Sequence, residues 1–312
     1  MLETIKAPAG VESDLCADCP RRCGVPRDGG AGLCGSDGRL RVASICLHRG
    51  EEPVISGEYG SITIFLPGCN LRCIFCQNYQ ISRREVVAVT PESSIPLLTR
   101  RLIGLIRQGG HNLNFVSPSH MTRLVVELVK SVRREGYPLP VVYNSNGYDS
   151  IEALRRVEGF VDIYMPDMKY GEAGPAREFS GAGDYVEVAT AALAEMRRQV
   201  GTDLEKDAHG VATRGILVRH LVLPGHVSNS LRALDIIAEQ LTPQVHLSLM
   251  AQYHPDAEAV SHPALGRFVS PDEYEQVVDH ALALGFENGW IQELSSPQHY
   301  RPDFDQAHPF ER

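Results

Sequence analysis

The sequence lacks the features of membrane-spanning, secreted and nucleic-acid-binding proteins. No stretch approaches the ~20 consecutive apolar residues that cross a bilayer, and the opening residues MLETIKAPAG contain no apolar run of a signal peptide. Positive charge is scarce, since 30 Lys and Arg against 39 Asp and Glu give a formal net charge of -9. Such a chain has no electrostatic footprint for duplex nucleic acid or an anionic membrane. We therefore expect a cytoplasmic globular protein that acts on small molecules or on proteins.

Cysteine is absent from residues 77–312, so all eight cysteines lie between positions 16 and 76. The reducing cytosol disfavours structural disulfides, and clustered thiols there more often bind metal or take part in redox reactions. The cysteines fall into three groups. The quartet is Cys16, Cys19, Cys23 and Cys34, the single residue is Cys46, and the trio is Cys69, Cys73 and Cys76. The quartet and the trio are the candidate metal ligands.

Composition divides the chain into three segments. Residues 1–58 carry the stretch CADCPRRCGVPRDGGAGLCGSDGRL, which is crowded with Cys, Gly, Pro and Arg and has the periodicity of neither a helix nor a strand. We expect a Cys-rich metal-binding segment here, because metal ligation can order a chain that buries little apolar surface. Residues 59–300 alternate short apolar runs with amphipathic stretches, the pattern of a parallel sheet with crossover helices. Residues 301–312 form a C-terminal tail.

Six apolar runs in the middle segment predict strands, and the stretches between them predict helices. The strands are expected at 61–66, 113–116, 140–144, 161–165, 215–223 and 245–250, with a further short strand suggested at 289–293. The helices are expected at 94–108, 121–136, 150–157, 184–200, 230–240 and 271–285. Six strand–helix units fall short of the eight of a full barrel, so we predict an α/β fold with an open, partial (β/α)6 barrel.

Polar and turn residues follow each predicted strand. PGCNLRC, SPSH, NSNGYD, PDMKY, PGHVSN and AQYHP come directly after the six runs. Because parallel strands end at the same edge of a sheet, the active site is expected at these carboxyl ends. A polar insertion at 195–210 is interpreted as a solvated excursion ending in a hairpin, and the alternative is a lid that carries Arg197, Arg198 and Gln199 over the barrel mouth.

The cysteine trio has the spacing C-x3-C-x2-C, with Phe75 immediately before the last cysteine. Three thiolates on a four-iron cluster leave one iron without a protein ligand and free to take a small chelating group. A zinc site with a remote fourth ligand and a redox-active cysteine cluster are the alternatives that the spacing leaves open.

The trio resembles the signature of the radical S-adenosylmethionine (radical SAM) superfamily, which has an aromatic residue at the position of Phe75. The resemblance covers about residues 14–295 and is closest to the activating enzymes of pyruvate formate-lyase and their relatives with an N-terminal cysteine motif. It is carried by GEEPVISGEYGSITIFLPGCNLRCIFCQN, NSNGY, DIYMPDMKY, VRHLVLPG and AQYHP. It implies a partial barrel of the radical SAM type, a [4Fe-4S] cluster on the trio, S-adenosyl-L-methionine as cofactor, and a reductant such as flavodoxin or ferredoxin.

The resemblance also implies roles for residues after the strands. Asn144 and Asn146 would lie near the ribose of the cofactor, with closure of an Asn-Gly turn as the alternative. Asp167, in an Asp-x-Lys pair with Lys169, would join a monovalent-cation site beside the cofactor, with a surface ion pair as the alternative. Arg219 lies in an apolar strand, where an unpaired cation is costly, and the resemblance assigns it to the carboxylate of the cofactor.

His254 resembles a histidine that faces the cofactor or the substrate, with a plain loop histidine as the alternative. One departure concerns the amino group of the cofactor. The activating enzymes receive it with a Gly-Gly-Glu-Pro stretch after the second strand, whereas this chain has SPSH at 117–120. Ser117 and Ser119 can accept the hydrogen bonds through hydroxyl or backbone oxygens. No residue is assigned as catalytic.

The cysteine quartet has the ligand count of a closed tetrathiolate site. Zn2+ would make it structural, and a second [4Fe-4S] cluster would make it an electron relay or a substrate anchor; free thiols are the alternative. Cys46 is interpreted as a small buried residue, with replacement of one quartet member as the alternative.

The leading hypothesis is a radical SAM enzyme that cleaves its cofactor reductively to a 5′-deoxyadenosyl radical, which abstracts hydrogen from a substrate. A glycyl-radical protein and a small molecule are both open as that substrate. A non-enzymatic iron–sulfur electron carrier or redox sensor is the alternative from another class, and cofactor cleavage discriminates between the two. A nucleic-acid-modifying enzyme is disfavoured by the acidic balance of the chain.

Overall fold

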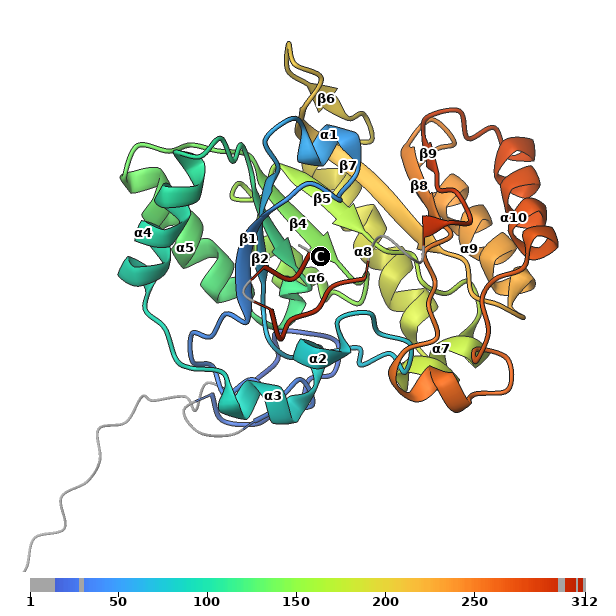
Figure 1. The fold of residues 1–312 in the computed structure, drawn as a ribbon, viewed down its shortest axis with the longest axis horizontal. Coiled ribbons are helices and arrows are strands. Elements are labelled where there is room, and N and C mark those ends of the chain that lie inside the picture. Colours follow the sequence, from blue (N-terminus) through green and yellow to red (C-terminus); the bar gives the residue numbers. More distant parts are fainter. Residues whose placement is uncertain (1–14, 28–30, 297–300, 307, 311–312) are drawn as a thin grey trace, which may run out of the picture.

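A sheet of mainly parallel strands organises the molecule (Figure 1). The structure is a computed structural model that describes residues 15–27, 31–296, 301–306 and 308–310. In this part of the chain the strands are β1 (Ser44–His48), β2 (Ser61–Phe65), β3 (Leu113–Val116), β4 (Val141–Ser145), β5 (Ile163–Pro166), β6 (Glu205–Lys206), β7 (Ala212–Leu221), β8 (His246–Met250) and β9 (Gly289–Ile291). They are ordered β1-β2-β3-β4-β5-β7-β8-β9, with β6 paired to β7.

The strands from β2 to β9 along this order are parallel, and β1 is antiparallel to β2 at one edge. The two edge strands, β1 and β9, are not paired with each other in the described part of the chain, so the sheet curves without closing. The prediction of an α/β fold with an open, partial barrel is confirmed. All six predicted strands are present, and the short seventh strand exists as β9.

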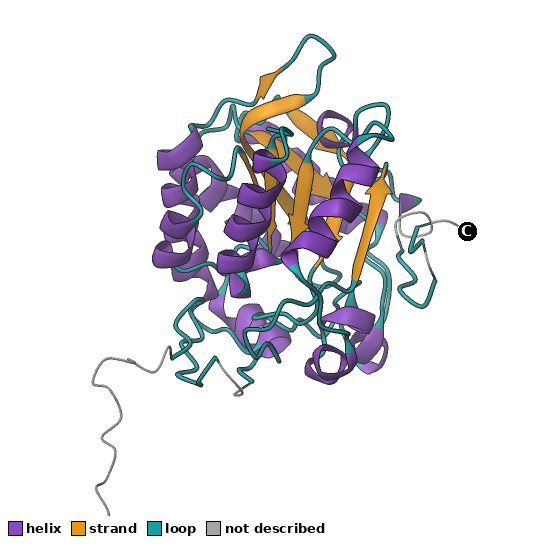
Figure 2. Cartoon of the chain, turned by 90° about the vertical axis from the view of Figure 1, so that its left-hand side faces the viewer, coloured by secondary structure: helices purple, strands orange, loops and turns teal. Residues whose placement is uncertain are grey.

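Helices cover the outer face of the sheet and stand in a layer in front of the strands in Figure 2. Their bounds are α1 (Pro53–Ser56), α2 (Tyr79–Ser82), α3 (Arg84–Val89), α4 (Ile95–Ile106), η1 (Pro118–His120), α5 (Thr122–Arg134), α6 (Ile151–Arg156), α7 (Ala173–Ser180), α8 (Tyr185–Val200), α9 (Val227–Gln240), η2 (Ala257–Ser261) and α10 (Pro271–Ala283). None of the helices in the described ranges is long and apolar enough to cross a bilayer.

The local sequence explains why these elements form. Every residue of β2 and β4 is buried, as expected for parallel strands covered on both faces. Helix α10 starts with a complete capping box, in which Ser270 accepts from the Glu273 backbone and the Glu273 side chain accepts from the Ser270 backbone, and Pro271 follows at the first helical position. Because these local sequence features determine where strands and helices begin and end, the observed elements lie near their predicted positions.

The polar insertion at 195–210 ends in a hairpin, as predicted. Residues up to 200 complete α8, and β6 then pairs antiparallel with the start of β7. This hairpin projects from the amino ends of the strands, opposite α2 and α3 in Figure 1. Arg197 donates to the carbonyl of Gln240, and Gln199 donates to the carbonyl of Leu154. The alternative of a lid over the barrel mouth is therefore wrong, because these side chains are held at the wrong end.

Part of the segment assigned to the cysteine quartet belongs to the sheet, since β1 lies at residues 44–48. The residues before β1 pack against the loop of the cysteine trio. Arg21 donates to the carbonyl oxygens of Asn70 at 2.9 Å, Ser180 at 2.9 Å and Gly181 at 2.6 Å. Its guanidinium also lies 5.1 Å from the centroid of the Tyr148 ring. One side chain thus joins the quartet segment to the trio loop and to the end of α7.

Gly68 fixes how closely these two segments approach. A Cβ added at Gly68 would lie 2.2 Å from the carbonyl oxygen of Cys34, and φ at Gly68 is +82°. Gly159 has a similar φ of +78° but no atom within 4 Å of an added Cβ. Alanine substitutions at Gly68 and Gly159 therefore separate the free-energy cost of a left-handed backbone from the free-energy cost of a close contact.

We expect Gly68→Ala to lower the free energy of unfolding by about 2 kcal/mol more than Gly159→Ala. Both substitutions carry the left-handed cost of about 1–2 kcal/mol, and Gly68→Ala adds an overpacking cost of about 1–3 kcal/mol. Denaturant unfolding of the two variants beside the wild type measures the difference. Equal losses in the two variants would show that the Cys34 contact is not rigid.

Candidate active site

The carboxyl ends of the barrel strands surround a cavity of about 690 Å3. This volume lies within the range of small-molecule sites. Many of the residues that the sequence predicts for the site line this cavity, namely Cys69, Cys73, Phe75, Cys76, Ser117, Asn144, Asn146, Asp167, Lys169 and Arg219. The fold therefore brings residues from four different strand ends and from the trio loop to one place.

The sulfurs of Cys69 and Cys73 in the trio receive hydrogen bonds that suit thiolate ligands. Cys69 Sγ accepts from the backbone of Leu71 and from Asn146 Nδ2, each at 3.4 Å. Cys73 Sγ accepts from Ser180 Oγ at 2.9 Å. Donors around the sulfurs of an iron–sulfur cluster stabilise its charge and tune its reduction potential. The donor set fits a thiolate-ligated cluster.

Burial raises the pKa of Cys76 to about 12 and also raises the pKa of Cys73. At neutral pH these buried thiols are protonated unless a cation compensates their charge, and coordination to a metal supplies that compensation. In the described ranges, no group of three or more His, Cys, Asp or Glu side chains is arranged to hold a metal ion. Phe75 supports the loop from behind through contacts with Tyr170, Phe179 and Tyr253.

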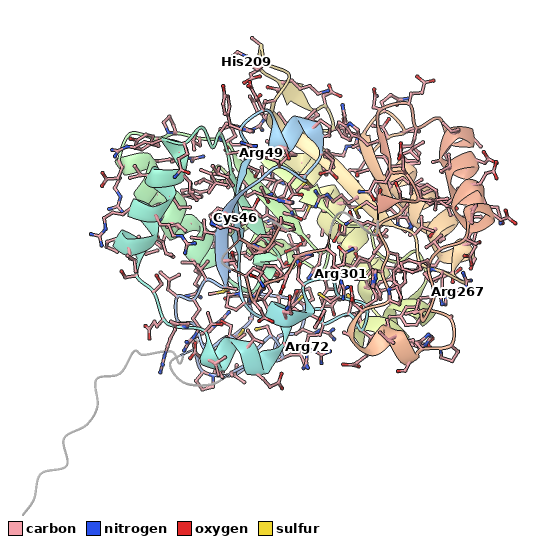
Figure 3. All side chains as sticks on the ribbon, viewed as in Figure 1. Cys46, Arg49, Arg72, His209, Arg267 and Arg301 are labelled. Carbon is pink, nitrogen blue, oxygen red and sulfur yellow. The ribbon has the colours of Figure 1, made fainter. Side chains whose placement is uncertain are left out.

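Two turns at the cavity place non-glycine residues in the left-handed region. Arg72, between the first two trio cysteines, has φ +59°, and Ser117, directly after β3, has φ +51°. Arg72 is labelled in Figure 3, close to α2 at the lower side of the molecule. Backbone of this kind costs about 1–3 kcal/mol per residue and persists where the surroundings enforce it. Both turns position groups that face the cavity.

Three charged residues, Lys169, Asp167 and Arg219, follow one another from the cysteine trio into the barrel, with charges of alternating sign. Lys169 Nζ lies 2.6 Å from Asp167 Oδ2, and both residues are largely buried. Burial acts to lower the pKa of Lys169, but Asp167 and the nearby cysteines raise it above its ordinary value. Asp167 in turn forms a backbone bridge with Arg219. The alternative of an ion pair between Asp167 and Lys169 is therefore present in the structure, but the pair lies at the cavity wall rather than on the surface.

Arg219 is neutralised by two glutamates that the sequence reasoning missed. Its Nε donates to Glu52 Oε1 at 2.8 Å, and its second terminal nitrogen, Nη2, contacts both Glu51 and Glu52. The remaining terminal nitrogen, Nη1, lies 3.4 Å from Asn144 Oδ1. The guanidinium implied for the carboxylate of the cofactor is thus already paired. The available signal was the GEEP stretch, in which two adjacent glutamates precede a proline.

The two asparagines have different surroundings. Asn146 Nδ2 donates to Asn70 Oδ1 at 2.8 Å as well as to the Cys69 sulfur, and Asn146 Oδ1 accepts from the Tyr148 backbone. Its amide therefore holds the trio loop. Asn144 lines the cavity, and its Oδ1 accepts from Arg219 Nη1.

Two predicted residues do not line the cavity. Ser119 is fully buried beside Asp149, and Ser117 alone of the SPSH serines reaches the cavity wall. His254 packs edge-on against Phe268, with Nδ1 3.4 Å from Asp256 Oδ2. These contacts direct the His254 ring away from the cavity.

The cysteine quartet lies behind the trio loop. Cys16, Cys19 and Cys34 are buried, and burial raises the pKa of Cys19 to about 12 and that of Cys34 to about 11. The four sulfurs are close enough to influence one another electrostatically. Gly68, next to Cys69, touches the Cys34 carbonyl. The two cysteine groups are therefore adjacent in the fold.

The C-terminal segment forms one side of the cavity. Pro302 and Phe310 line it, and the Phe310 ring lies 3.7 Å from the ring of His48. Phe304 packs edge-on against Phe65 of β2. These contacts place the described residues after 300 across the unpaired edge of the sheet, in front of β1 and β2 in Figure 1.

No family model matches the chain. The chain is 28% identical over 273 residues to an uncharacterized protein of Methanocaldococcus jannaschii, a match that covers 85% of this chain and 74% of that protein. Among solved structures it is similar to methylornithine synthase, with a TM-score of 0.47 and 15% sequence identity. That similarity covers 69% of this chain, and this chain spans 59% of the length of that structure. The chemistry of the cavity therefore has to be inferred from its own residues.

The buried pair of Glu52 and Arg219 gives stability a dependence on pH. Burial acts to raise the pKa of Glu52, but Arg219 lowers it below its ordinary value near 4.3. The stability from this pair is fully present above about pH 4.3 and is lost as the pH falls through the lower pKa of the folded state. In metal-free protein at pH 7, Glu52→Gln should lower the free energy of unfolding by about 3 kcal/mol. The deficit should shrink as the pH falls toward 3.

Denaturant unfolding between pH 3 and 7 measures this effect. The exposed Glu58 lies in the same segment, and Glu58→Gln should change the free energy of unfolding by less than about 0.5 kcal/mol. A deficit for Glu52→Gln that stays constant with pH would contradict the role assigned to its charge.

Proposed function

We propose that this protein is a radical SAM enzyme, in which Cys69, Cys73 and Cys76 hold a [4Fe-4S] cluster. The observation that carries the proposal is that all three cysteines lie on one loop at the wall of a ligand-sized cavity, with the sulfurs of Cys69 and Cys73 accepting hydrogen bonds. Three protein ligands would leave one iron of the cluster free to take a further ligand. A non-enzymatic electron carrier needs neither the open iron nor the polar cavity beside it.

When bound, the cluster and S-adenosylmethionine supply reductive cleavage of the cofactor to methionine and a 5′-deoxyadenosyl radical, which takes a hydrogen atom from the substrate. One electron per cleavage comes from a reductant such as flavodoxin or ferredoxin. The chain holds the reacting groups in place and excludes water from the cavity. We assign no residue of the chain to the hydrogen transfer itself.

We assign the cavity residues the roles that the resemblance to the radical SAM superfamily implies, except where their contacts in the structure favour a different role. Because Arg219 is paired with Glu51 and Glu52, only its Nη1 atom is left to share with the carboxylate of the cofactor, together with Lys169 from its pair with Asp167. Ser117 offers oxygens to the amino group of the cofactor. Asn144 is the candidate for the ribose, whereas Asn146 positions the trio loop. Asp167 remains the candidate for a monovalent-cation site. A direct role for His254 or Ser119 is not part of the proposal.

The substrate that the cavity favours is a small molecule. Pro302 and Phe310 narrow the open side of the barrel, through which a protein loop would have to enter. A glycyl-radical protein is the second candidate, supported by the likeness of the sequence motifs to the activating enzymes. It would require the C-terminal segment to move aside.

We further propose that the cysteine quartet binds Zn2+ or a second [4Fe-4S] cluster. The adjacency of Cys34 to the trio loop supports an electron relay for the second case. In the first case the metal would serve to order residues 15–27 and 31–43.

The first experiment measures 5′-deoxyadenosine after anaerobic reconstitution with iron and sulfide and addition of S-adenosylmethionine and a strong reductant. Wild type should form 5′-deoxyadenosine, and Cys76→Ala should lose at least ~100-fold because the cluster lacks a ligand. Cys46→Ala is the matched control, since Cys46 is a buried cysteine of β1 outside both groups, and it should keep the activity. Wild type with a reducible cluster whose electron paramagnetic spectrum does not change with S-adenosylmethionine would refute the proposal.

Measurement of the zinc and iron bound per chain tests whether the cysteine quartet binds metal. Cys19→Ala should lose either bound zinc or about four of about eight irons per chain, while the trio cluster persists. Cys46→Ala again serves as the control. A metal content unchanged by Cys19→Ala would show that the quartet holds free thiols.

A further inference from the structure

The sulfur of Cys73 lies at the end of a chain of two hydroxyl groups. Ser180 Oγ donates to Cys73 Sγ at 2.9 Å, and the hydroxyl oxygen of Tyr170 lies 2.6 Å from Ser180 Oγ. Ser180 and Tyr170 are both buried, so little water competes for these hydrogen bonds. Tyr170 follows β5 and Ser180 is the last residue of α7, so one connection of the barrel supplies both hydroxyl groups.

The direction of the two hydrogen bonds follows from the final acceptor. A thiolate bound to iron carries no proton and can only accept, so the proton of Ser180 points to Cys73. Since Ser180 has only this one proton, Tyr170 has to donate to Ser180 Oγ. The direct distance from the Tyr170 hydroxyl to Cys73 Sγ is 4.0 Å, too long to compete with the contact of Ser180. Both hydroxyl dipoles therefore point their positive ends toward the sulfur.

The other two trio cysteines have different donors. Cys69 accepts from a backbone N–H group and from the Asn146 amide, each at 3.4 Å. Ser82 offers a hydroxyl group to Cys76. Among the hydrogen bonds within the described ranges, a serine that is itself held by a buried tyrosine is found at Cys73. This cysteine has the most strongly polarised donor of the three.

The end of α7 is fastened to the trio loop, which fixes the Ser180 hydroxyl beside Cys73. The backbone nitrogen of Ile74 donates to the carbonyl oxygen of Phe179 at 2.9 Å. Arg21 donates to the carbonyl oxygen of Ser180 at 2.9 Å. These donors occupy carbonyl groups at the C-terminal end of the helix, where a partial negative charge would otherwise oppose the addition of an electron nearby.

We propose that Ser180 and Tyr170 raise the reduction potential of the cluster on the trio, by donating this chain of hydrogen bonds to Cys73. The inference rests on the proposed function, because it takes the trio to hold a [4Fe-4S] cluster. Reduction adds one electron, and part of the added negative charge falls on the cysteine sulfurs. A donor therefore stabilises the reduced cluster more than the oxidised cluster. Tyr170 is a positioning residue, since it acts on the sulfur through Ser180.

The raised potential matters for the supply of electrons. Cofactor cleavage consumes one electron, which a protein reductant of the flavodoxin or ferredoxin type passes to the cluster. A cluster with a higher potential takes up this electron from a weaker reductant. The two hydroxyl groups thus extend the range of reductants that can serve the enzyme.

The test is a redox titration of the full chain after anaerobic reconstitution, without S-adenosylmethionine. Electron paramagnetic resonance follows the trio signal, identified as the signal that Cys76→Ala lacks. At the wild-type midpoint, Ser180→Ala should lower the ratio of reduced to oxidised cluster about 3- to 10-fold. For a one-electron couple this corresponds to a potential about 28–59 mV lower. Tyr170→Phe should give a smaller shift in the same direction.

Two further variants separate the hydrogen bond from packing. Ser180→Thr keeps a hydroxyl group and should keep the wild-type potential. Tyr164 is another completely buried tyrosine, and its hydroxyl group donates to Gln199 instead of toward a sulfur. Tyr164→Phe should therefore leave the potential unchanged. The iron content of each variant shows whether the trio cluster is complete.

Each outcome decides. An unchanged potential in Ser180→Ala with a complete cluster overturns the inference, and so does an equal shift in Ser180→Thr, because the hydroxyl group would then not be the cause. If Ser180→Ala assembles no cluster, Tyr170→Phe decides: a lower potential supports the inference and the wild-type potential overturns it.

Failure of the proposed function looks different. A wild type without the trio signal overturns the cluster and this inference together. A lower potential in Ser180→Ala, beside a wild-type spectrum that does not respond to S-adenosylmethionine, refutes the cofactor chemistry and leaves the role of Ser180 and Tyr170 intact.

Discussion

The buried contact between Arg219 and the two adjacent glutamates determines the depth and shape of the cavity. An arginine in the middle of an apolar strand is too costly to leave unpaired, so carboxylates must reach it inside the barrel. Glu51 and Glu52 lie more than 160 residues earlier in the chain. The ion pairs of these two glutamates with Arg219 hold the turn between β1 and α1 inside the barrel, and this turn forms the bottom of the cavity. Without that contact the cavity would have no bottom between β2 and β7.

The unclosed sheet creates the second constraint. A full barrel hides its edges by pairing the first strand with the last, whereas here β1 and β9 remain apart in the described part of the chain. Aromatic side chains of the C-terminal segment cover the β2 side of this gap through Phe304 and Phe310. Side-chain packing thus covers the strands beside the gap, but it does not pair the backbone groups of the edge strands as a closed barrel does.

Local sequence patterns were sufficient for the main strands and helices, because parallel strands are continuous apolar runs and the amphipathic helices repeat clearly. Patterns failed where an element is short or gains its stability from elsewhere. Helices α2 and α3 have four and six residues, and β1 is a strand only because β2 offers it an antiparallel partner. The spacing of the trio cysteines groups them in the sequence, and the structure places all three at the cavity. The glutamates at the bottom of the cavity could not be found from the sequence, because their partner is Arg219, and no local pattern joins positions so far apart.

The contact between Gly68 and the Cys34 carbonyl also bears on how the protein is assembled in the cell. The loop that carries the trio rests on the quartet segment, and Arg21 fastens the two through backbone carbonyls. A segment rich in glycine and poor in apolar residues has little reason to be ordered before its metal arrives. On the proposal that the quartet binds metal, its loading would order the surface on which the trio loop rests and would ease cluster assembly on the trio without being required for it. Maturation would then be fastest when it begins at the amino-terminal segment.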